Sequence, residues 1–440
     1  MPGAINHPSH HLRRTLSQCA IAAALIGLSC CASPGTDGSQ TLTAPGTQAP
    51  TPIRRDYAIP QIALEAHPEC FTTVDRQAGR YLGQPTSVLF KDGKTVLAAY
   101  PGGHGHGALF LSRSTDAGQT WQRLGIPPQN VDEVPVLHKI TLPDGRERVV
   151  LFTCRPQAGV LEWMWSDDCG STWSARRNLR LEGTRGAMVA LASLWPADAS
   201  GMRHRGVFHD FNFDNHTIDL VVKPDSHGGY DCVLENLAHI NYQTPGGLDA
   251  ARSAGLCEAG VAFSPDRKRM ALLMRPQNKK TNAMICFSDD MGKTWTDPRE
   301  MQGSLTGERH VIRTAPDGRL VVCFRDYSPL NPGNPSHGDW VAWVGTWDDL
   351  VRSQAGQYRI RLHRNVGNST NDRIGDCGYT GLEVLPDGAF LAISYGHWEA
   401  IPHSTHPNHP DGRGQSPFIL AARFKLADTD AWVKGEGGKR

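Results

Sequence analysis

Short apolar runs separated by turn residues dominate the sequence between about residues 80 and 425, and helical periodicity is almost absent. Runs of about four to eight residues bounded by Gly, Pro, Asn or Asp are typical of β-strands. The clearest runs are Thr86–Phe90, Thr95–Tyr100, Val149–Thr153, Met270–Met274, Leu320–Phe324, Trp340–Thr346 and Phe390–Tyr395. This pattern predicts an all-β protein built from many short strands.

An eight-residue loop with the pattern S-x-D-x-G-x-T-W occurs three times, at Ser114–Trp121, Ser166–Trp173 and Ser288–Trp295. The aspartate of such a loop can accept hydrogen bonds from backbone N–H groups further along. The glycine permits the positive φ that closes the turn, and the tryptophan can pack back onto apolar surface. We therefore predict that these aspartates are structural rather than catalytic.

A tight turn rich in Asp, Pro and Gly precedes each of these loops at a constant distance. Asp92, Asp144 and Asp266 lie 24 residues before the loop aspartates (116−92, 168−144 and 290−266). Similar turns at Asp317-Gly318 and Asp387-Gly388, with a degenerate one at Pro196-Ala197-Asp198, complete a series of six. Repeated units of about 40–60 residues with several short strands each are typical of β-propellers. The spacing therefore predicts a six-bladed β-propeller.

The repeated loop resembles the Asp-box, or BNR repeat, of the sialidase (neuraminidase) superfamily. The resemblance covers about residues 80 to 425. It implies a six-bladed propeller domain over residues 61–435 and a retaining glycoside hydrolase that releases a terminal acidic sugar, such as sialic acid. Asp-boxes also occur in non-catalytic propellers, so an activity must be argued from individual side chains.

Glu258 and Tyr379 are the first candidates for catalysis. Glu258 stands in L-C-E-A-G-V just before an apolar strand, and Tyr379 stands in D-C-G-Y-T-G before a strand and an Asp-Gly turn. Sialidases depart from the two-carboxylate rule of glycosidases and use a tyrosine nucleophile. The resemblance implies that Tyr379 attacks the sugar and that Glu258 takes its proton. Otherwise, Glu258 is a surface acid and Tyr379 an aromatic packed near the propeller axis.

Three arginines are candidates for binding a substrate carboxylate. Arg275 and Arg325 end apolar runs in successive units, and Arg309 opens the second of these units. Two or three guanidinium groups bind a carboxylate strongly through paired hydrogen bonds. The resemblance implies this role for all three. For Arg325 and Arg309, local ion pairs with Asp326 or Glu308 are the alternative.

Two departures from the sialidase pattern lie in the first unit. Sialidases have an arginine two residues before a proline, where this sequence has Gly83. Either Arg80 takes the place of that arginine, or this part of the carboxylate-binding cluster is missing. The loop that carries an aspartate in sialidases reads Y-P-G-G-H-G-H-G-A in this sequence, with His104 and His106. A histidine can act as a general acid near neutral pH. We expect one of these histidines to be the acid–base, with Asp210 as the next candidate.

No metal or cofactor is expected. His104 and His106 lack an evident third ligand nearby, and the mechanism implied by the resemblance needs no metal. The eight cysteines after residue 31 form no C-x-x-C pair. A disulfide such as Cys257 with Cys377 is compatible with an exported protein.

Residues 1–31 have the features of a bacterial export signal. Arg13-Arg14 precede the apolar run Leu16–Leu28, which is too short to span a membrane. The following Ser29-Cys30-Cys31 resembles a lipobox, and the choice between a lipid anchor on Cys31 and plain cleavage stays open. Residues 32–60 are rich in Gly, Pro, Ser and Thr and predict a disordered linker. We expect a periplasmic or cell-surface protein.

The remaining features bear on partners and on other functions. A net charge of +1 gives no indication of a nucleic-acid partner. The resemblance to sialidases implies a carbohydrate partner. His204–Tyr242 and Ser328–Asp339 are interpreted as long insertions that build a ligand-binding face. A lyase or hydrolase for a uronic or deoxy sugar, using His104, His106 and Tyr379, is the first alternative. A non-catalytic glycan-binding module is the second, and the oligomeric state is not predicted.

Overall fold

The structure is a computed structural model that describes residues 52–436 apart from 56–58, 126–129, 329, 332, 367–375 and 400–415. The predicted signal peptide (1–31) and most of the predicted linker (32–60) lie outside the described residues. Within the described part of the chain, no helix has the length and apolar character needed to cross a membrane.

The described strands form six sheets, and the first three come from the first half of the chain. Blade one contains, from the innermost strand outwards, β3 (Thr86–Leu89), β4 (Val96–Pro101), β5 (Gly107–Ser114) and β6 (Gln122–Arg123), with β7 (Asn130–Val131) beside β5. In the same order, blade two contains β8 (Val136–Thr141), β9 (Glu147–Arg155), β10 (Val160–Ser166) and β11 (Arg177–Arg180). Blade three contains β12 (Met188–Pro196), β13 (Arg203–His209), β14 (Asn215–Pro224) and β15 (Tyr230–His239).

The second half of the chain supplies the other three blades. Blade four contains β16 (Leu256–Phe263), β17 (Met270–Pro276), β18 (Met284–Ser288) and β19 (Arg299–Glu300). Blade five contains β20 (Glu308–Thr314), β21 (Leu320–Arg325), β22 (Trp340–Gly345), β23 (Tyr358–His363) and β1 (Gln61–Ala63). Blade six contains β24 (Thr380–Val384), β25 (Phe390–Gly396), β26 (Phe418–Phe424) and β2 (Phe71–Asp75).

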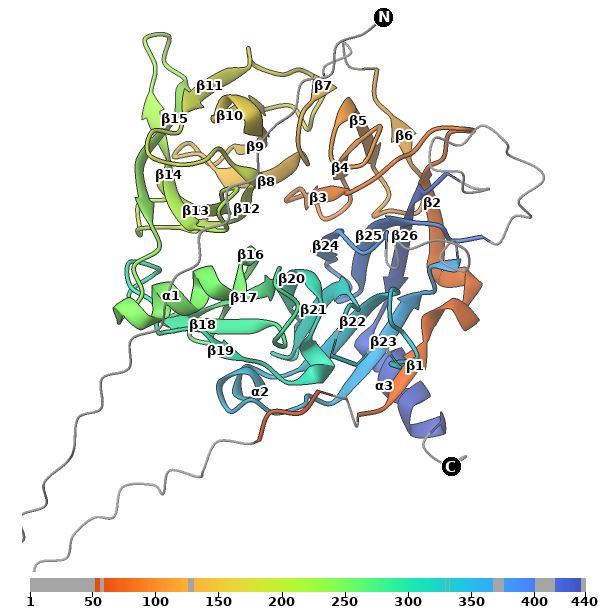
Figure 1. The fold of residues 1–440 in the computed structure, drawn as a ribbon. Coiled ribbons are helices and arrows are strands. Elements are labelled where there is room, and N and C mark those ends of the chain that lie inside the picture. The colour runs from red at the N-terminus through yellow and green to blue at the C-terminus, as the bar shows by residue number, and fades with distance from the viewer. Residues whose placement is uncertain are drawn as a thin grey trace, which may run out of the picture. The chain divides into compact units, whose positions relative to one another are not determined.

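The six blades stand in a ring, as Figure 1 shows. The innermost strands contact one another in succession, and β24 of the last blade contacts β3 of the first. The N-terminal strand β2 completes blade six by pairing antiparallel with β26, and β1 pairs parallel with β23. Both ends of the described chain are therefore held in the last two blades. The prediction of an all-β, six-bladed β-propeller is confirmed.

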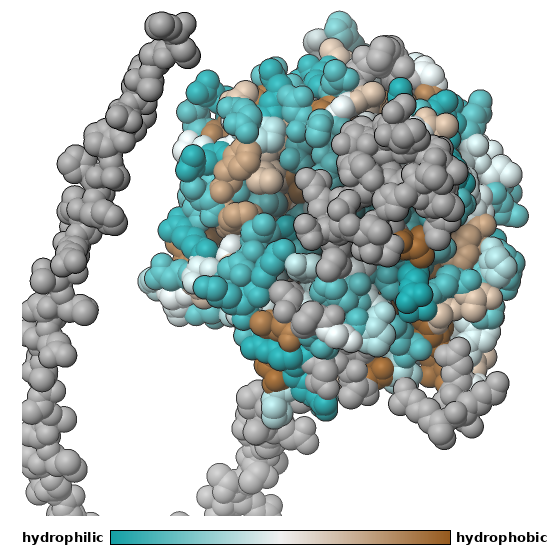
Figure 2. All heavy atoms as spheres, turned by 45° about the vertical axis from the view of Figure 1, so that its right-hand side comes forward, coloured by the Kyte–Doolittle hydropathy of each residue, from teal (hydrophilic) through white to brown (hydrophobic). Residues whose placement is uncertain are grey.

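The apolar core is divided among the interfaces between neighbouring blades. Each of the six main buried clusters combines side chains of two adjacent blades; Val96 and Ile393, for example, pack in the cluster between blades one and six. The face drawn in Figure 2 is mainly hydrophilic, with scattered hydrophobic residues. Among the described large hydrophobic residues, only Ile53 and Phe211 are exposed. The ring thus resolves how a chain of this length buries its apolar surface without one large core.

The six predicted turns all join an innermost strand to the second strand of its blade. In the first turn, Asp92 Oδ1 accepts hydrogen bonds from the backbone N–H groups of Lys94 and Thr95, at 2.9 and 2.8 Å. The degenerate turn at residues 196–198 joins β12 to β13 in the same way. The sequence spacing therefore counts blades correctly because each turn occupies the same place in its blade.

The three S-x-D-x-G-x-T-W loops join the third and fourth strands of blades one, two and four. The aspartate Oδ1 atom accepts a hydrogen bond from the backbone N–H of the threonine four residues later. This distance is 2.8 Å for Asp116 and Asp168 and 2.9 Å for Asp290. The hydrogen bonds predicted for these aspartates are present, and they account for the residues without any catalytic role.

The glycine of each loop packs against the preceding blade. A Cβ added to Gly118 would lie 2.6 Å from Leu391 in blade six, and one added to Gly170 would lie 2.8 Å from Leu97 in blade one. A Cβ on Gly292 would lie 2.7 Å from Trp195 in blade three. The absence of a side chain therefore allows each loop to close the gap to its neighbour.

Helices make up a small part of the described chain. The α-helices are α1 (Pro245–Ala254), α2 (Trp347–Val351) and α3 (Leu426–Glu436), and the 3₁₀ helices are η1 (Leu64–Ala66), η2 (Pro68–Cys70), η3 (Pro156–Ala158) and η4 (Gly303–Leu305). Helix α1 carries ordinary boundary signals: the Thr244 hydroxyl accepts a hydrogen bond from Gly247, and Gly255 ends the helix with φ +64°. These signals were present in the sequence.

The interpretation of His204–Tyr242 as an inserted loop was wrong, because most of this segment forms β13, β14 and β15 of blade three. Its strands look polar in sequence because they carry charges that pair within the sheet. Asp219 is 1% exposed and accepts hydrogen bonds from Arg203 and Arg205, at 3.0 and 2.9 Å. Such internal pairing allows charged residues in a buried strand.

The eight cysteines in the described part are all free thiols, so the Cys257–Cys377 disulfide does not form. Both side chains are buried, and each sulfur lies near a backbone carbonyl instead. Cys377 Sγ donates to Gly338 O at 3.2 Å, and Cys257 Sγ lies 3.8 Å from Arg275 O. Burial raises the pKa of the Cys257 thiol to about 12, so this group stays protonated at neutral pH.

Replacing Gly170 by alanine is expected to lower the free energy of unfolding by about 2–4 kcal/mol, because the new Cβ meets Leu97 and the backbone φ is +84°. Gly145→Ala is the matched control: its φ is +81°, but nothing lies within 4 Å, so it carries only a backbone cost of about 1 kcal/mol. Urea denaturation measures both variants. Equal losses would show that the contact with blade one contributes nothing.

Candidate active site

The candidate side chains gather near the axis, where the innermost strands begin. Glu258 lies in β16, Arg309 lies in β20, and Tyr379 immediately precedes β24. Gln84 stands two residues before β3. The innermost strands of a propeller run side by side along its axis in the same direction, so their first residues meet at one end of the axis.

Tyr379 and Glu258 are in direct contact, although 121 residues separate them in sequence. The Tyr379 hydroxyl donates a hydrogen bond to Glu258 Oε1. Glu258 is 4% exposed, whereas the tyrosine is partly accessible. The structure therefore brings the predicted nucleophile and its predicted base together.

Burial and the adjacent Glu258 carboxylate raise the pKa of the Tyr379 hydroxyl well above its usual range, while the guanidinium groups of Arg275 and Arg325 act in the opposite direction. The phenol is therefore protonated at neutral pH. For the phenolic oxygen to act as a nucleophile, a base must take its proton as the new bond forms. Glu258 is hydrogen-bonded to that proton and is placed for this role.

Glu258 has a strained backbone. Its φ is 55°, in the left-handed region, and it occupies a bulge of β16 between Cys257 and Gly260. Arg309 has φ 58° at the corresponding bulge of β20 in the next blade. Such conformations cost about 1–3 kcal/mol each and concentrate at functional sites. In a regular strand, successive side chains point to opposite faces of the sheet. The bulges interrupt this alternation at Glu258 and Arg309.

Arg275 and Arg325 occupy equivalent places in blades four and five, at the ends of β17 and β21. These are the second strands of their blades, so the two apolar runs that the arginines end are not innermost strands. Arg275 Nη1 lies 3.3 Å from Glu258 Oε2 and 3.4 Å from Glu308 Oε2. Arg325 Nε donates to the same Glu308 oxygen at 2.8 Å. Glu308 therefore holds the two guanidinium groups side by side.

Glu308 is the local partner that the sequence offered as an alternative for Arg325. Asp326, the other alternative, instead pairs with the fully buried Arg359 at 2.5 Å. Burial alone would raise the pKa of Glu308, but the guanidinium groups of Arg325 and Arg275 hold it at about 2. Glu308 is therefore charged at neutral pH, and a substrate carboxylate would share the two arginines with it.

Arg309 does not join the other two arginines on Glu308. It is 3% exposed, and its Nη1 donates to the carbonyl of Ala192 in blade three at 3.2 Å. Burial lowers its pKa, against the influence of Glu258 and Tyr379. Arg309 also lines an axial cavity of about 580 Å³ bordered by the innermost strands of all six blades. Arg309 is thus a buried cation beside the Tyr379–Glu258 pair and does not form an ion pair with Glu308.

Arg80 lies away from the other arginines. It is exposed, and its guanidinium group stacks on the Phe110 ring with 5.3 Å to the ring centroid. In the sequence, Gln84 stands between Arg80 and the first strand, and its amide contacts the glycine-rich loop that carries His104. The Gln84 Oε1 atom accepts a hydrogen bond from Gly105 N at 2.8 Å, and Nε2 lies 3.2 Å from His104 Nδ1. The structure does not supply the arginine that sialidases have in their first blade.

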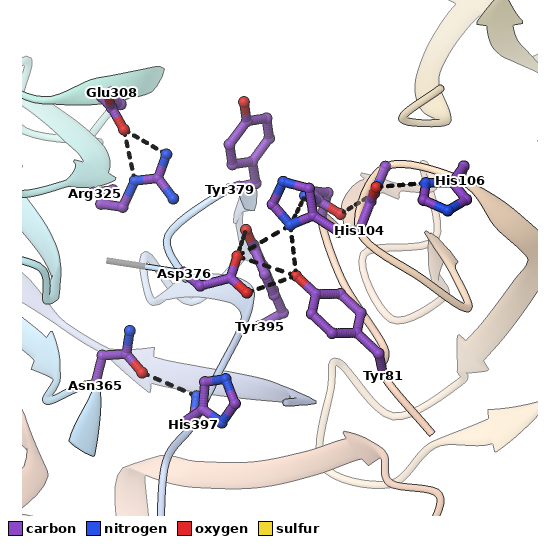
Figure 3. A network of polar contacts seen from close by, with 12 residues as sticks. Tyr81, His104, His106, Glu308, Arg325, Asn365, Asp376, Tyr379, Tyr395 and His397 are labelled. Atoms are coloured by element: carbon purple, nitrogen blue, oxygen red, sulfur yellow. Dashed lines mark hydrogen bonds and ion pairs between the residues drawn. The ribbon is translucent and has the colours of Figure 1, made fainter. Parts of the chain in front are cut away.

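His104 belongs to a network that joins blades one and six, drawn in Figure 3. Its Nδ1 lies 2.9 Å from the Tyr81 hydroxyl and 3.2 Å from Asp376 Oδ1. Tyr81 donates to Asp376 at 3.0 Å, and Tyr395 donates to it at 3.1 Å. The Tyr395 ring lies 6.4 Å from that of Tyr379, so the network is continuous with the tyrosine–glutamate pair.

The other acid candidates are placed differently. His106 is exposed, and its Nδ1 lies 2.8 Å from the carbonyl of His104, so it braces the loop. Asp210 is 2% exposed, and its two oxygens accept backbone N–H groups of Arg185, Asn212 and Asp214. Its carboxylate thus organises a turn, and the expectation of Asp210 as an acid finds no geometric support.

Sequence reasoning missed Asp376, Tyr81, Tyr395 and Glu133. Glu133 lies before β8, where a Cβ added to Gly105 would come within 3.3 Å of its Oε1. Burial raises the pKa of Glu133, and the Glu258 carboxylate adds to the increase. Asp376 could have been found from the sequence, because it stands three residues before Tyr379 in D-C-G-Y. Tyr81 and Glu133 stand shortly before the first strand of a blade, and Tyr395 lies in the second strand of blade six; the sequence gives no further signal for these three.

Within the described residues, no group of three or more His, Cys, Asp or Glu side chains could hold a metal ion. The arrangement is instead one of proton donors, proton acceptors and cations around a phenol. Such a site can carry out nucleophilic and acid–base chemistry.

No family model matches the chain, and no curated protein matches it by sequence. Solved structures do share its fold. One is a protein of unknown function from Dyadobacter fermentans, with TM-score 0.54 and 16% identity, covering 80% of this chain and 97% of that one. Another is a mutant of the NanB sialidase from Streptococcus pneumoniae, with TM-score 0.52 and 10% identity, covering 82% and 71%. Sialidases are thus among the structural neighbours, and at this identity the likeness concerns the fold.

Glu308→Gln is expected to lower the free energy of unfolding by about 3 kcal/mol at pH 7, because it leaves two buried guanidinium groups without their shared carboxylate. The pKa of about 2 lies below the ordinary 4.5, so this contribution is present above pH 4.5 and is lost as the pH falls towards 2. Urea denaturation at several pH values should give wild-type and variant curves that converge near pH 2. A constant difference at all pH values would contradict the assignment.

Proposed function

We propose that the protein is an exported exo-glycosidase of the sialidase type, which releases a terminal acidic sugar from glycans with retention of configuration. The observation that carries this proposal is the hydrogen bond from Tyr379 to Glu258, flanked by Arg275 and Arg325. Sialidases are one of the groups of glycosidases that depart from the two-carboxylate mechanism, and they use a tyrosine nucleophile.

The residues divide the reaction as follows. The Tyr379 oxygen attacks the anomeric carbon while its proton passes to Glu258, and the bond to the leaving oxygen breaks. The acid–base histidine supplies a proton to that oxygen, which departs as an alcohol. Water then attacks the glycosyl–tyrosine intermediate, giving its proton to the histidine, and Glu258 returns the proton to Tyr379. Two displacements at one carbon retain the configuration.

The charges around Tyr379 favour an anionic substrate. Three guanidinium groups, those of Arg275, Arg325 and Arg309, lie near the phenol; Arg275 and Arg325 face the carboxylates of Glu258 and Glu308, and Arg325 also faces Asp376. Within the described chain, Arg309 forms no ion pair. Arg309 is therefore the cation that a carboxylate on the sugar would complement, because a charge in a poorly solvated site binds a counterion strongly.

Export is proposed from the N-terminal sequence alone. The basic start, the short apolar run and the lipobox-like cysteine support secretion to the periplasm or cell surface, where terminal sugars of glycans are accessible.

Tyr379→Phe is expected to lower kcat about 10³-fold or more on the best substrate, because the nucleophilic oxygen is removed. Tyr100→Phe is the matched control, since Tyr100 is also a buried phenol that donates to an aspartate, Asp75 at 2.8 Å, but lies away from Glu258. Circular dichroism checks that both variants are folded. Full activity of Tyr379→Phe would overturn the nucleophile assignment.

A panel of methylumbelliferyl glycosides tests the substrate class. Sialosides or uronides are expected to be cleaved at least about 100-fold faster, as kcat/KM, than the corresponding neutral glycosides, because loss of a bidentate ion pair costs about 3 kcal/mol. Formation of an unsaturated sugar, seen by its ultraviolet absorbance, would favour a lyase. Binding of acidic glycans without turnover would favour a non-catalytic module.

A further inference from the structure

We propose that Asp376 and Tyr81 act as positioning residues that hold Nδ1 of His104, so that the opposite nitrogen, Nε2, is the acid–base group of the site. The inference rests on the proposed glycosidase function. It chooses between the two histidines of the loop and assigns roles to two residues that the sequence did not single out.

Nδ1 of His104 has three polar neighbours. This nitrogen lies 2.9 Å from the Tyr81 oxygen and 3.2 Å from Asp376 Oδ1, and Nε2 of Gln84 also lies 3.2 Å from it. Tyr81 also donates its own proton to Asp376, so its oxygen remains free to accept a proton from Nδ1. A proton on Nδ1 therefore has two oxygen acceptors, whereas the Gln84 amide nitrogen can only donate; we infer that the charged Asp376 carboxylate outweighs the neutral amide. The second nitrogen is then the one that exchanges a proton with substrate.

Asp376 and His104 differ sharply in solvent exposure, although they are in contact. Asp376 is 4% exposed, whereas the His104 side chain is 52% exposed. The engaged edge of the ring faces the buried network, and within the described residues Nε2 makes no hydrogen bond. Figure 3 shows the imidazole between Tyr379 and the Asp376–Tyr81 pair. The ring thus has one anchored side and one side open to a ligand.

The carboxyl group of Asp376 that anchors His104 carries a negative charge. Burial alone would raise the pKa of Asp376, but its hydrogen bonds to His104 and Tyr81, together with the Arg325 guanidinium, hold the pKa well below the usual range. Asp376 therefore remains a carboxylate across the working range of a histidine. A carboxylate at Nδ1 stabilises the imidazolium that a general acid needs before it gives up its proton.

The loop that carries His104 is built to hold it in place. Gly105 N donates to Gln84 Oε1, and Gly105 has φ +81°. A Cβ on Gly103 would lie 2.6 Å from the carbonyl of His106. His106 braces this loop and does not reach Asp376. Its ring stands on the far side of the loop in Figure 3.

The charged and titratable groups that face His104 are few. Asp376 and Tyr81 lie on one side, Glu133 comes from the segment before β8, and His106 belongs to the same loop. Arg325 acts through Asp376. Glu133 is the rival acid, since it is a carboxyl group with a raised pKa near the same loop. The experiment must therefore separate Glu133 from His104.

The tautomer of His104 can be measured without any substrate. In wild-type protein labelled with ¹⁵N-histidine, above the pH at which His104 loses its charge, the His104 nitrogens are expected to show Nδ1 protonated and Nε2 unprotonated. Asp376→Asn should shift the population towards the Nε2–H form, because the amide can donate to Nδ1. A wild-type His104 that is protonated mainly on Nε2 would overturn the proposal, whether or not the protein cleaves any glycoside.

Leaving-group dependence gives the catalytic readout, with sialyllactose and a methylumbelliferyl sialoside as probes (or the uronide pair, if uronides prove to be the substrates). His104→Ala and Asp376→Asn are expected to slow cleavage of the natural linkage about 10²–10⁴-fold, but that of the activated aryl glycoside much less, because a good leaving group needs little acid assistance. Azide should restore turnover of the aryl glycoside by His104→Ala, since it attacks the intermediate without a base.

Asp339→Asn is the control for loss of a buried aspartate elsewhere, as Asp339 is 5% exposed and has no hydrogen bond to His104. It should leave the ratio between the two substrates unchanged. If Glu133→Gln shows the leaving-group-dependent loss and His104→Ala does not, the proposal is wrong. If wild type cleaves neither substrate pair, the proposed function fails, while the tautomer measurement still decides the role of Asp376.

Discussion

Closure of the ring is the constraint on which every other feature depends. Six blades enclose an axis only if the first and last innermost strands meet, and in this protein β24 contacts β3 while β2 from the N-terminal side completes the outer edge of blade six. No disulfide joins the described cysteines, so backbone pairing and the apolar interfaces between blades hold the ring closed. The loop glycines reinforce this closure, because each one permits direct contact with the preceding blade.

The ring concentrates charge at one end of the axis. Glu258, Glu308 and three arginines come from blades four and five, and Asp376, Tyr81 and His104 come from blades six and one. Each arginine that contacts Glu308 is also held by packing, so the charges are fixed before any ligand arrives. Preorganised charge of this kind stabilises developing charge without the cost of reorienting solvent. The left-handed backbone at Glu258 and Arg309 is part of the same arrangement, since the bulges of β16 and β20 hold these side chains at the end of the axis.

Repetition explains why the fold could be predicted and why its exceptions could not. The constant spacing of 24 residues between turn and loop recurs because the same two hairpins occur in blades one, two and four, and the count of six followed from the turns of all six units. The strands of blade three were missed because Asp219, Arg203 and Arg205 pair inside its sheet and hide its strand pattern. Helix α1 was missed although Thr244 and Gly255 mark its ends, because it is a single short helix among many strands.

The sequence by itself determined the six repeated units, the local hydrogen bonds of their loops, and the residue types available at the start of each blade. Those features depend on contacts within about 30 residues, which the order of amino acids fixes directly. Only the tertiary structure decided that Glu308 stands between Arg275 and Arg325, that Arg309 faces the axial cavity, and that Asp376 reaches His104. These contacts join blades that are distant along the chain, and their partners follow from the rotation of each blade about the axis. No local pattern of residues encodes that rotation.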